Sequence, residues 1–219
     1  MKPLPSLAII VLLGMTVPGC ALFAKKPLAG SVLQGRIEDN TYTSPQGSFQ
    51  FRVPWLSANA TLRDETPGPD TVLVTIADDL CRQFIVSQRP GYLGSQSLAS
   101  WVDEHIVKDL KHMGFDVRSQ PVLTGAGPAI ALYYRAPAAA PCSHQVEVDG
   151  KEVARKRDAD VGWYVYHRDG RFFRMIYFIG TGPGSPEVWY IKREPVDEVL
   201  AQFAEGFKIF SAKGEASLE

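Results

Sequence analysis

Four histidines are the side chains best suited to acid–base or metal chemistry in this sequence. His105 and His112 are seven residues apart on a predicted helix, which is too far for the i, i+4 pair that clamps a metal ion. His105 also belongs to the apolar stripe of that helix, where a hydrogen-bonded core histidine is more common than a ligand. His167 lies in an aromatic strand, and His144 directly follows Ser143. The adjacent side chains of Ser143 and His144 do not form a catalytic pair. The spacing of the four histidines therefore predicts no catalytic residue, cofactor site or metal site.

Three cysteines are the remaining reactive groups. Cys20 lies near the N-terminus, whereas Cys81 and Cys142 lie in the body of the chain, without a CxxC partner or a histidine at metal spacing. In an oxidising compartment these two form an even pair. A disulfide that closes a loop of about 60 residues would stabilise the fold by about 4 kcal/mol. The alternative is two unpaired thiols, and the sequence leaves both possibilities open.

The first twenty residues have the organisation of an export signal. Lys2 supplies a positive charge, and residues 7–13 (LAIIVLL) form an apolar run that is far shorter than the roughly 20 residues of a membrane-spanning helix. The segment ends in residues 17–20 (VPGC), which resemble the lipobox of bacterial lipoproteins. In a lipobox, a small residue precedes a cysteine that is diacylated and becomes the mature N-terminus. The resemblance implies that Cys20 carries the lipid, including palmitate-type chains.

Lipidation would hold the protein on a membrane surface, because each buried CH₂ group contributes about 0.8 kcal/mol and two or more chains anchor stably. Ala21 rather than Asp follows the cysteine, and by resemblance to the sorting rule of enteric bacteria this points to the outer membrane, facing the periplasm. An ordinary secretory signal cut nearby, for example after Ala24, is the alternative and would discard Cys20.

Composition and charge limit the possible partners and the number of domains. The chain has 219 residues, of which 45% are hydrophobic and 21% charged, which fits one globular domain. Its 23 Lys and Arg against 24 Asp and Glu leave a formal charge of −1, so nucleic acid is not expected as a partner. We expect a signal peptide over residues 1–19, a tether over 20–40 that begins at the lipidated cysteine, a single domain over 41–212, and a disordered tail over 213–219.

Hydrophobic periodicity predicts a mixture of strands and helices. Apolar residues at three- and four-residue spacing predict helices over residues 95–113 and 195–210. Asp149-Gly150 and Asp169-Gly170 predict two-residue hairpin turns, because Asp-Gly readily supplies the positive φ that such turns need. Alternating or β-branched runs predict further strands over residues 48–53, 71–77, 82–88, 116–124 and 129–135.

Two groups of side chains in the predicted hairpins allow a structural or a functional interpretation. The basic run Lys151, Arg155, Lys156 and Arg157 could touch an anionic surface, although a solvated hairpin edge fits its interspersed acids better. The aromatic residues of the second hairpin are expected to be core rather than an exposed contact site. They are Trp163, Tyr164, Tyr166, Phe172, Phe173, Tyr177 and Phe178.

The order of these elements indicates an α+β layered domain. Residues 42–45 (YTSP), which lead into residues 47–54 (GSFQFRVP), resemble the opening strand of the PsbP-like fold, which is shared with Mog-type Ran-binding proteins and bacterial DcrB-type lipoproteins. Residues 110–115 (LKHMGF) and 206–210 (GFKIF) fit the same pattern. The resemblance spans roughly residues 42–210 and implies a central antiparallel β-sheet with helices packed on both faces, a PsbP-like α/β/α sandwich.

The resemblance brings no shared catalytic residues, because members of this family are mostly accessory or assembly factors. We therefore expect a lipid-anchored periplasmic accessory or assembly protein that binds another envelope protein without catalysis. Its contact with the membrane would be through the N-terminal acyl chains, and no cofactor is expected. Two alternatives stay open: an envelope hydrolase whose site forms only in three dimensions, and a carrier with a closed apolar cavity for a small apolar ligand.

Overall fold

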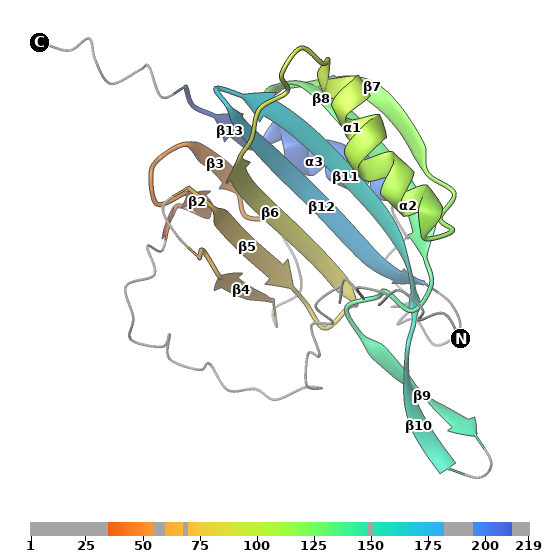
Figure 1. Ribbon diagram of the computed structural model, residues 1–219. Coiled ribbons are helices and arrows are strands. Elements are labelled where there is room, and N and C mark those ends of the chain that lie inside the picture. The colour runs from red at the N-terminus through yellow and green to blue at the C-terminus, as the bar shows by residue number, and fades with distance from the viewer. Residues whose placement is uncertain (1–34, 55–59, 68–69, 149–150, 182–194, 212–219) are drawn as a thin grey trace, which may run out of the picture.

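The computed structural model describes residues 35–54, 60–67, 70–148, 151–181 and 195–211 (Figure 1). These residues form a seven-stranded antiparallel sheet, a four-stranded sheet and a separate two-stranded hairpin. The large sheet has the order β4-β5-β6-β12-β11-β8-β7, and the small sheet has the order β1-β2-β3-β13. The strands of the large sheet are β4 (Thr61–Asp64), β5 (Val72–Ala77), β6 (Arg82–Pro90), β7 (Arg118–Thr124), β8 (Gly127–Ala136), β11 (Asp158–Arg168) and β12 (Arg171–Thr181).

The other elements are short. The small sheet contains β1 (Arg36–Glu38), β2 (Thr41–Thr43), β3 (Phe49–Arg52) and β13 (Phe207–Ile209), and the hairpin contains β9 (Ser143–Val148) and β10 (Lys151–Lys156). One continuous helical segment consists of α1 (Leu98–Val102), the π-helical turn η1 (Asp103–Val107) and α2 (Lys108–His112), and the last helix is α3 (Val196–Glu205). None of the helices in the described ranges is long and apolar enough to span a bilayer.

Aromatic rings fill the space between the small sheet and one face of the large sheet. Phe84 of β6 lies 4.4 Å from Tyr177 of β12 and 4.8 Å from Phe203 of α3, measured between ring centroids. Phe49 of β3 meets Phe173 of β12 edge to face at 6.1 Å. We call this cluster the aromatic core; its ring-bearing members include Tyr42, Phe49, Phe51, Phe84, Phe173, Tyr177, Phe203 and Phe207.

Two polar contacts tie the small sheet to the large one. The Ser48 hydroxyl donates to the Gln88 side-chain oxygen, and both residues are buried. The Tyr42 hydroxyl donates to the Asp64 carboxylate at 2.7 Å, and the Gly35 backbone N–H donates to the same carboxylate oxygen at 2.7 Å. Because burial and the bonded Asp64 both favour the neutral phenol, the pKa of Tyr42 lies well above its usual value.

The helical segment α1–η1–α2 packs on the opposite face of the large sheet, over β8 and β11 (Figure 1). Ser97 caps its start by accepting a hydrogen bond from the Ser100 backbone N–H at 3.1 Å. Its apolar side chains, among them Val102, Ile106 and Leu110, pack with residues such as Leu132 and others of the large sheet. The periodicity of the sequence therefore predicted this helix correctly, although not its π-helical turn.

The predicted sandwich with helices on both faces is wrong. Strands make up 53% of the described residues and helices only 17%, and the second face of the large sheet is covered by the small sheet together with the ten-residue helix α3. The predicted helix over residues 195–210 is also too long. That helix ends at Gly206, and the following residues form β13, in which Phe207 pairs with Phe51 and Ile209 with Phe49 of β3.

Both predicted hairpins are present, although the turn residues Asp149 and Gly150 of the first one lie outside the described residues. Arg168 pairs with Arg171 across Asp169 and Gly170, whose φ angles of 50° and 70° are those of the predicted turn. Val148 of β9 pairs with Lys151 of β10. The aromatic residues of the second hairpin are core as predicted, because five of them are buried and Trp163 and Phe178 are partly buried.

Candidate functional site

Two of the histidines lie at the ends of one aromatic stack. His105 stacks on Trp101 with ring centroids 4.6 Å apart, Trp101 stacks on Phe172 at 4.0 Å, and His167 tilts against Phe172 at 4.8 Å. A His167 ring nitrogen lies 3.0 Å from the Gly91 carbonyl oxygen. These contacts join the helical segment to the β11–β12 hairpin, which is a structural role. They do not assemble the His, carboxylate and hydroxyl that the hydrolase alternative requires.

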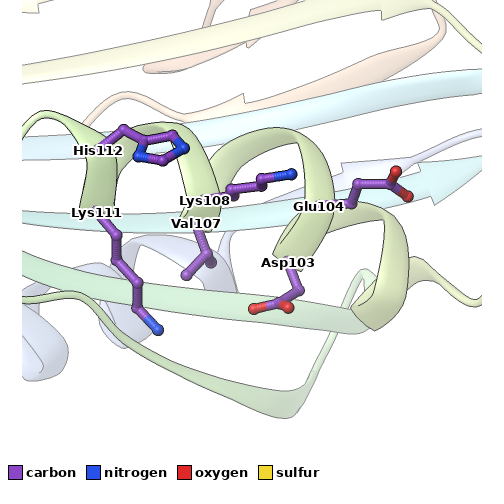
Figure 2. A pocket seen from close by; sticks show the side chains of 6 residues that line it. All are labelled: Asp103, Glu104, Val107, Lys108, Lys111 and His112. Carbon is purple, nitrogen blue, oxygen red and sulfur yellow. The ribbon is translucent and has the colours of Figure 1, made fainter.

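His112 lies in a shallow depression on the outside of the helical segment (Figure 2). The side chains that line it spread along the helix and do not converge on one point. Glu104 and Lys108 are four residues apart, a spacing at which opposite charges on a helix attract each other weakly. The depression is therefore a solvated, mixed-charge helix face. The residues around it are Asp103, Glu104, Val107, Lys108, Lys111 and His112.

Across the described ranges, no three His, Cys, Asp or Glu side chains are grouped so that they could hold a metal ion. The side chain of His144 lies outside the described part of the structure. So do Cys20, residues 1–19 and residues 213–219, so their predicted roles stay predictions. Arg36–Glu38 forms β1 within the range 20–40 that was expected to be a tether.

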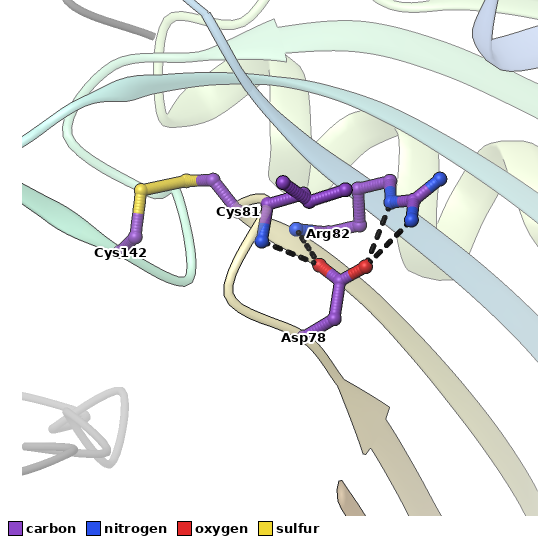
Figure 3. Close-up of a disulfide and its surroundings, with 5 residues drawn as sticks. Asp78, Cys81, Arg82 and Cys142 are labelled. Atoms are coloured by element: carbon purple, nitrogen blue, oxygen red, sulfur yellow. Dashed lines mark hydrogen bonds and ion pairs between the residues drawn. A yellow bond between two sulfur atoms is a disulfide. The ribbon is translucent and has the colours of Figure 1, made fainter. Parts of the chain in front are cut away.

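Cys81 and Cys142 form a disulfide, which confirms the paired alternative (Figure 3). Cys81 lies in the turn between β5 and β6 and has a positive φ of 63°. The Asp78 carboxylate holds this turn: it accepts hydrogen bonds from the backbone N–H groups of Leu80 and Arg82, both at 3.1 Å, and from the Arg82 Nε at 2.9 Å. Cys142 lies immediately before β9. The disulfide therefore fastens the base of the β9–β10 hairpin to the rim of the large sheet.

We call β9 and β10 the hairpin arm, because they project from the body of the protein as a separate two-stranded sheet (Figure 1). All six residues of β10 are exposed, and the apolar Val153 is 42% exposed. The returning strand is also held at the base. The Ala140 backbone N–H donates to the Arg157 carbonyl at 3.0 Å, and the Ala138 backbone N–H donates to the Asp158 carboxylate at 3.2 Å.

The second notable surface is the part of the large sheet that the helical segment leaves uncovered. Over β5 and β6, and along the neighbouring part of β12, Figure 1 shows no described element on the face opposite the aromatic core. We call this surface the open face. Its outward side chains at one end are only partly buried or exposed, and they are Leu73, Ser87, Arg89 and Arg174.

The aromatic core also bears on the carrier alternative. A carrier of a small apolar ligand needs an empty apolar space, but the volume between the sheets contains rings in mutual contact. Phe51 and Phe203, for example, lie 5.5 Å apart, and Tyr42 and Phe51 lie 5.0 Å apart. The described core is therefore packed with its own side chains.

Sequence reasoning missed that Arg89 and Arg174 are diagonal neighbours, because only the register of β6 and β12 brings together residues so far apart in the chain. The Tyr42–Asp64 contact was missed for the same reason. The alternation of Gln88 and Arg89, or of Phe173 and Arg174, is a weak signal that each arginine faces away from the core.

Comparisons with known proteins show no family for this chain. No family model matches it, and neither does any curated protein. A crystal structure from Bacteroides thetaiotaomicron VPI-5482 matches 83% of this chain at 10% identity, with a TM-score of 0.40. This chain covers only 50% of that one.

The solution structure of cyanobacterial PsbP (CyanoP) from Synechocystis sp. PCC 6803 matches 85% of this chain and 99% of its own at 11% identity, with a TM-score of 0.45. A PsbP is therefore among the structural neighbours, but at these scores neither likeness carries an argument about function.

Proposed function

We propose that this protein is a lipid-anchored accessory protein of the bacterial periplasm that binds another envelope protein through its hairpin arm. The arm is the observation that carries the proposal. A two-stranded ribbon with every side chain of one strand in solvent gains little from packing in the free protein. Its fixed base and unpaired edges make it suited to binding.

The edges of the arm determine the kind of contact that we propose. In the described structure the arm pairs with no further strand, so each of its edges presents free backbone N–H and carbonyl groups. A partner protein that adds an extended segment would satisfy these groups. Val153 offers an apolar contact, and Lys151 and Arg155, on the same face of the strand, favour an acidic segment.

The proposed location rests on the sequence at Cys20 and is supported by the chemistry of the body. A disulfide that staples a domain is typical of oxidising compartments such as the periplasm. The proposed anchor would leave the arm free to meet proteins of the same envelope.

Mass spectrometry of the mature protein tests the anchor. We expect the N-terminal residue to be Cys20 carrying acyl chains, and we expect Cys20→Ala to abolish both the modification and the membrane association. An unmodified N-terminus beyond Cys20 would remove the anchor from the proposal and leave the arm untouched.

Site-specific photocrosslinking in intact cells tests the arm. A photoreactive residue at Val153 is compared with one at Leu123, which is also apolar and is 84% exposed on the edge strand β7. We expect position 153 to give one discrete crosslinked envelope protein that position 123 does not give. The same set of weak adducts at both positions would contradict a specific role for the arm.

A further inference from the structure

Two arginines lie side by side on the open face, and neither forms an ion pair with a residue in the described ranges. Arg174 of β12 pairs in register with Ser87 of β6, so Arg89, two residues further along β6, is its diagonal neighbour. Diagonal neighbours across two strands are about 7–8 Å apart, within reach of long side chains. Gln88 is completely buried, and Phe173 belongs to the aromatic core. Alternation therefore directs Arg89 and Arg174 to the opposite, open face.

The environment of the Arg174 guanidinium group is costly for its charge, whereas the Arg89 side chain is exposed. The Arg174 Nε is buried and has no hydrogen-bond partner among the residues that the structure describes. Burial and, second, the nearby charge of Arg89 lower the pKa of Arg174 to about 10, and burial also lowers the pKa of Arg89. The ion pairs in the described part of the chain involve other arginines, namely Arg36, Arg82 and Arg135.

Like charges that are partly withdrawn from water are stabilised when an anion binds between them. A guanidinium group presents a planar fork of N–H donors that matches the oxygens of phosphate or carboxylate. Two forks and the hydroxyl of Ser87 together call for at least three acceptor oxygens and close to two negative charges. A phosphate group meets both requirements, whereas a single carboxylate has two oxygens and one charge.

We infer that Arg89, Arg174 and Ser87 form a binding site for a phosphate group. The group can be free phosphate or the phosphomonoester headgroup of a lipid such as phosphatidic acid, which presents the same three terminal oxygens, and the recognising chemistry is the same in both cases. The site does not depend on the hairpin arm or on the lipid at Cys20.

Titration calorimetry on the full-length protein in non-ionic detergent tests the site, with inorganic phosphate as the probe and acetate at equal ionic strength as the anion control. We expect phosphate to bind at least tenfold more tightly than acetate. Arg174→Gln and Arg89→Gln are each expected to weaken phosphate binding at least tenfold. Arg171→Gln is the matched control, because it removes the same charge from β12 at the hairpin turn and should leave binding within twofold of the wild type.

Two outcomes would overturn the proposed site. One is that phosphate binds no more tightly than acetate, and the other is that Arg171→Gln and Arg174→Gln lose binding equally. If Arg174→Gln does not fold, Arg89→Gln decides, because the Arg89 side chain is exposed and its loss leaves no cavity. Dihexanoyl phosphatidic acid, used below its micelle concentration, separates the two sources. Tighter binding than inorganic phosphate assigns the site to a lipid headgroup, and equal or weaker binding assigns it to free phosphate.

Discussion

Replacing both Cys81 and Cys142 with alanine is expected to lower the free energy of unfolding by about 4 kcal/mol. The disulfide joins residues 61 positions apart, and on the chain-entropy model a closed loop of that length removes about 4 kcal/mol of conformational freedom from the unfolded chain. With a urea dependence of roughly 2 kcal/mol per molar, the unfolding midpoint should fall by about 2 M.

The measurement is urea unfolding followed by fluorescence, on wild type and on the double variant, each with and without reductant. Reductant should shift the wild-type midpoint to that of the variant and should leave the variant unchanged. Because Asp78 and Arg82 hold the turn around Cys81 independently of the sulfur bridge, the native fold should persist at low urea. A wild-type midpoint that does not respond to reductant would refute the reasoning, as would loss of near-ultraviolet circular dichroism before any urea is added.

Three further predictions follow from buried contacts. Asp78→Ala should destabilise the fold by about 3–5 kcal/mol, because it leaves the partly buried Arg82 guanidinium without its carboxylate. A urea midpoint within about 0.3 M of the wild-type midpoint would contradict this prediction. Gly162→Ala should lower the free energy of unfolding by about 1–3 kcal/mol, because the added Cβ would lie 2.6 Å from Val196 Cγ1 of α3. Gly125→Ala is the milder control in the same thermal melts, because its Cβ would lie 3.9 Å from the nearest neighbouring atom. Stability should fall above pH 10, because folding raises the pKa of Tyr42, Tyr133, Tyr134 (to about 12) and Tyr166, mainly through burial. Their neutral forms stabilise the fold fully below the unfolded pKa of about 10, and each loses about 1 kcal/mol by pH 11. Arg174 has the opposite effect, because its pKa is lowered in the folded protein. Its contribution to stability therefore rises over the same pH range and offsets the loss from one of the four tyrosines. A urea midpoint that stays constant between pH 9 and pH 11 would contradict the assignment.

Local patterns predicted the elements whose structure is decided locally. The Asp-Gly turns, the central strands and the helical segment all follow from short-range periodicity and turn chemistry. The end of the last helix did not follow, because Phe207 fits the apolar stripe of a continued helix as well as the alternation of a strand. The strand forms because the helix ends at Gly206 and because the edge of β3 is available for pairing. Since β3 lies near the other end of the described chain, local patterns could not reveal this pairing.

The candidate sites depended even more on long-range pairing. The sequence left the disulfide undecided, because its formation depends on the distance between Cys81 and Cys142. In the structure their Cα atoms are 5.2 Å apart. The two arginines of the open face are ordinary charged residues until the pairing of Ser87 with Arg174 places them diagonally. The histidines, by contrast, were candidates by residue type alone. His105 and His167 pack against the aromatic rings that join the helical segment to the large sheet.

The pairing of β13 with β3 has a consequence for how the chain reaches its native state. The small sheet is incomplete until Phe207 has met Phe51, so the strands near residues 36–52 must wait for a strand made more than 150 residues later in the chain. Contacts of such long sequence separation form slowly. A chain that is still being synthesised therefore keeps the edge of β3 without its partner strand until residue 209 has been made.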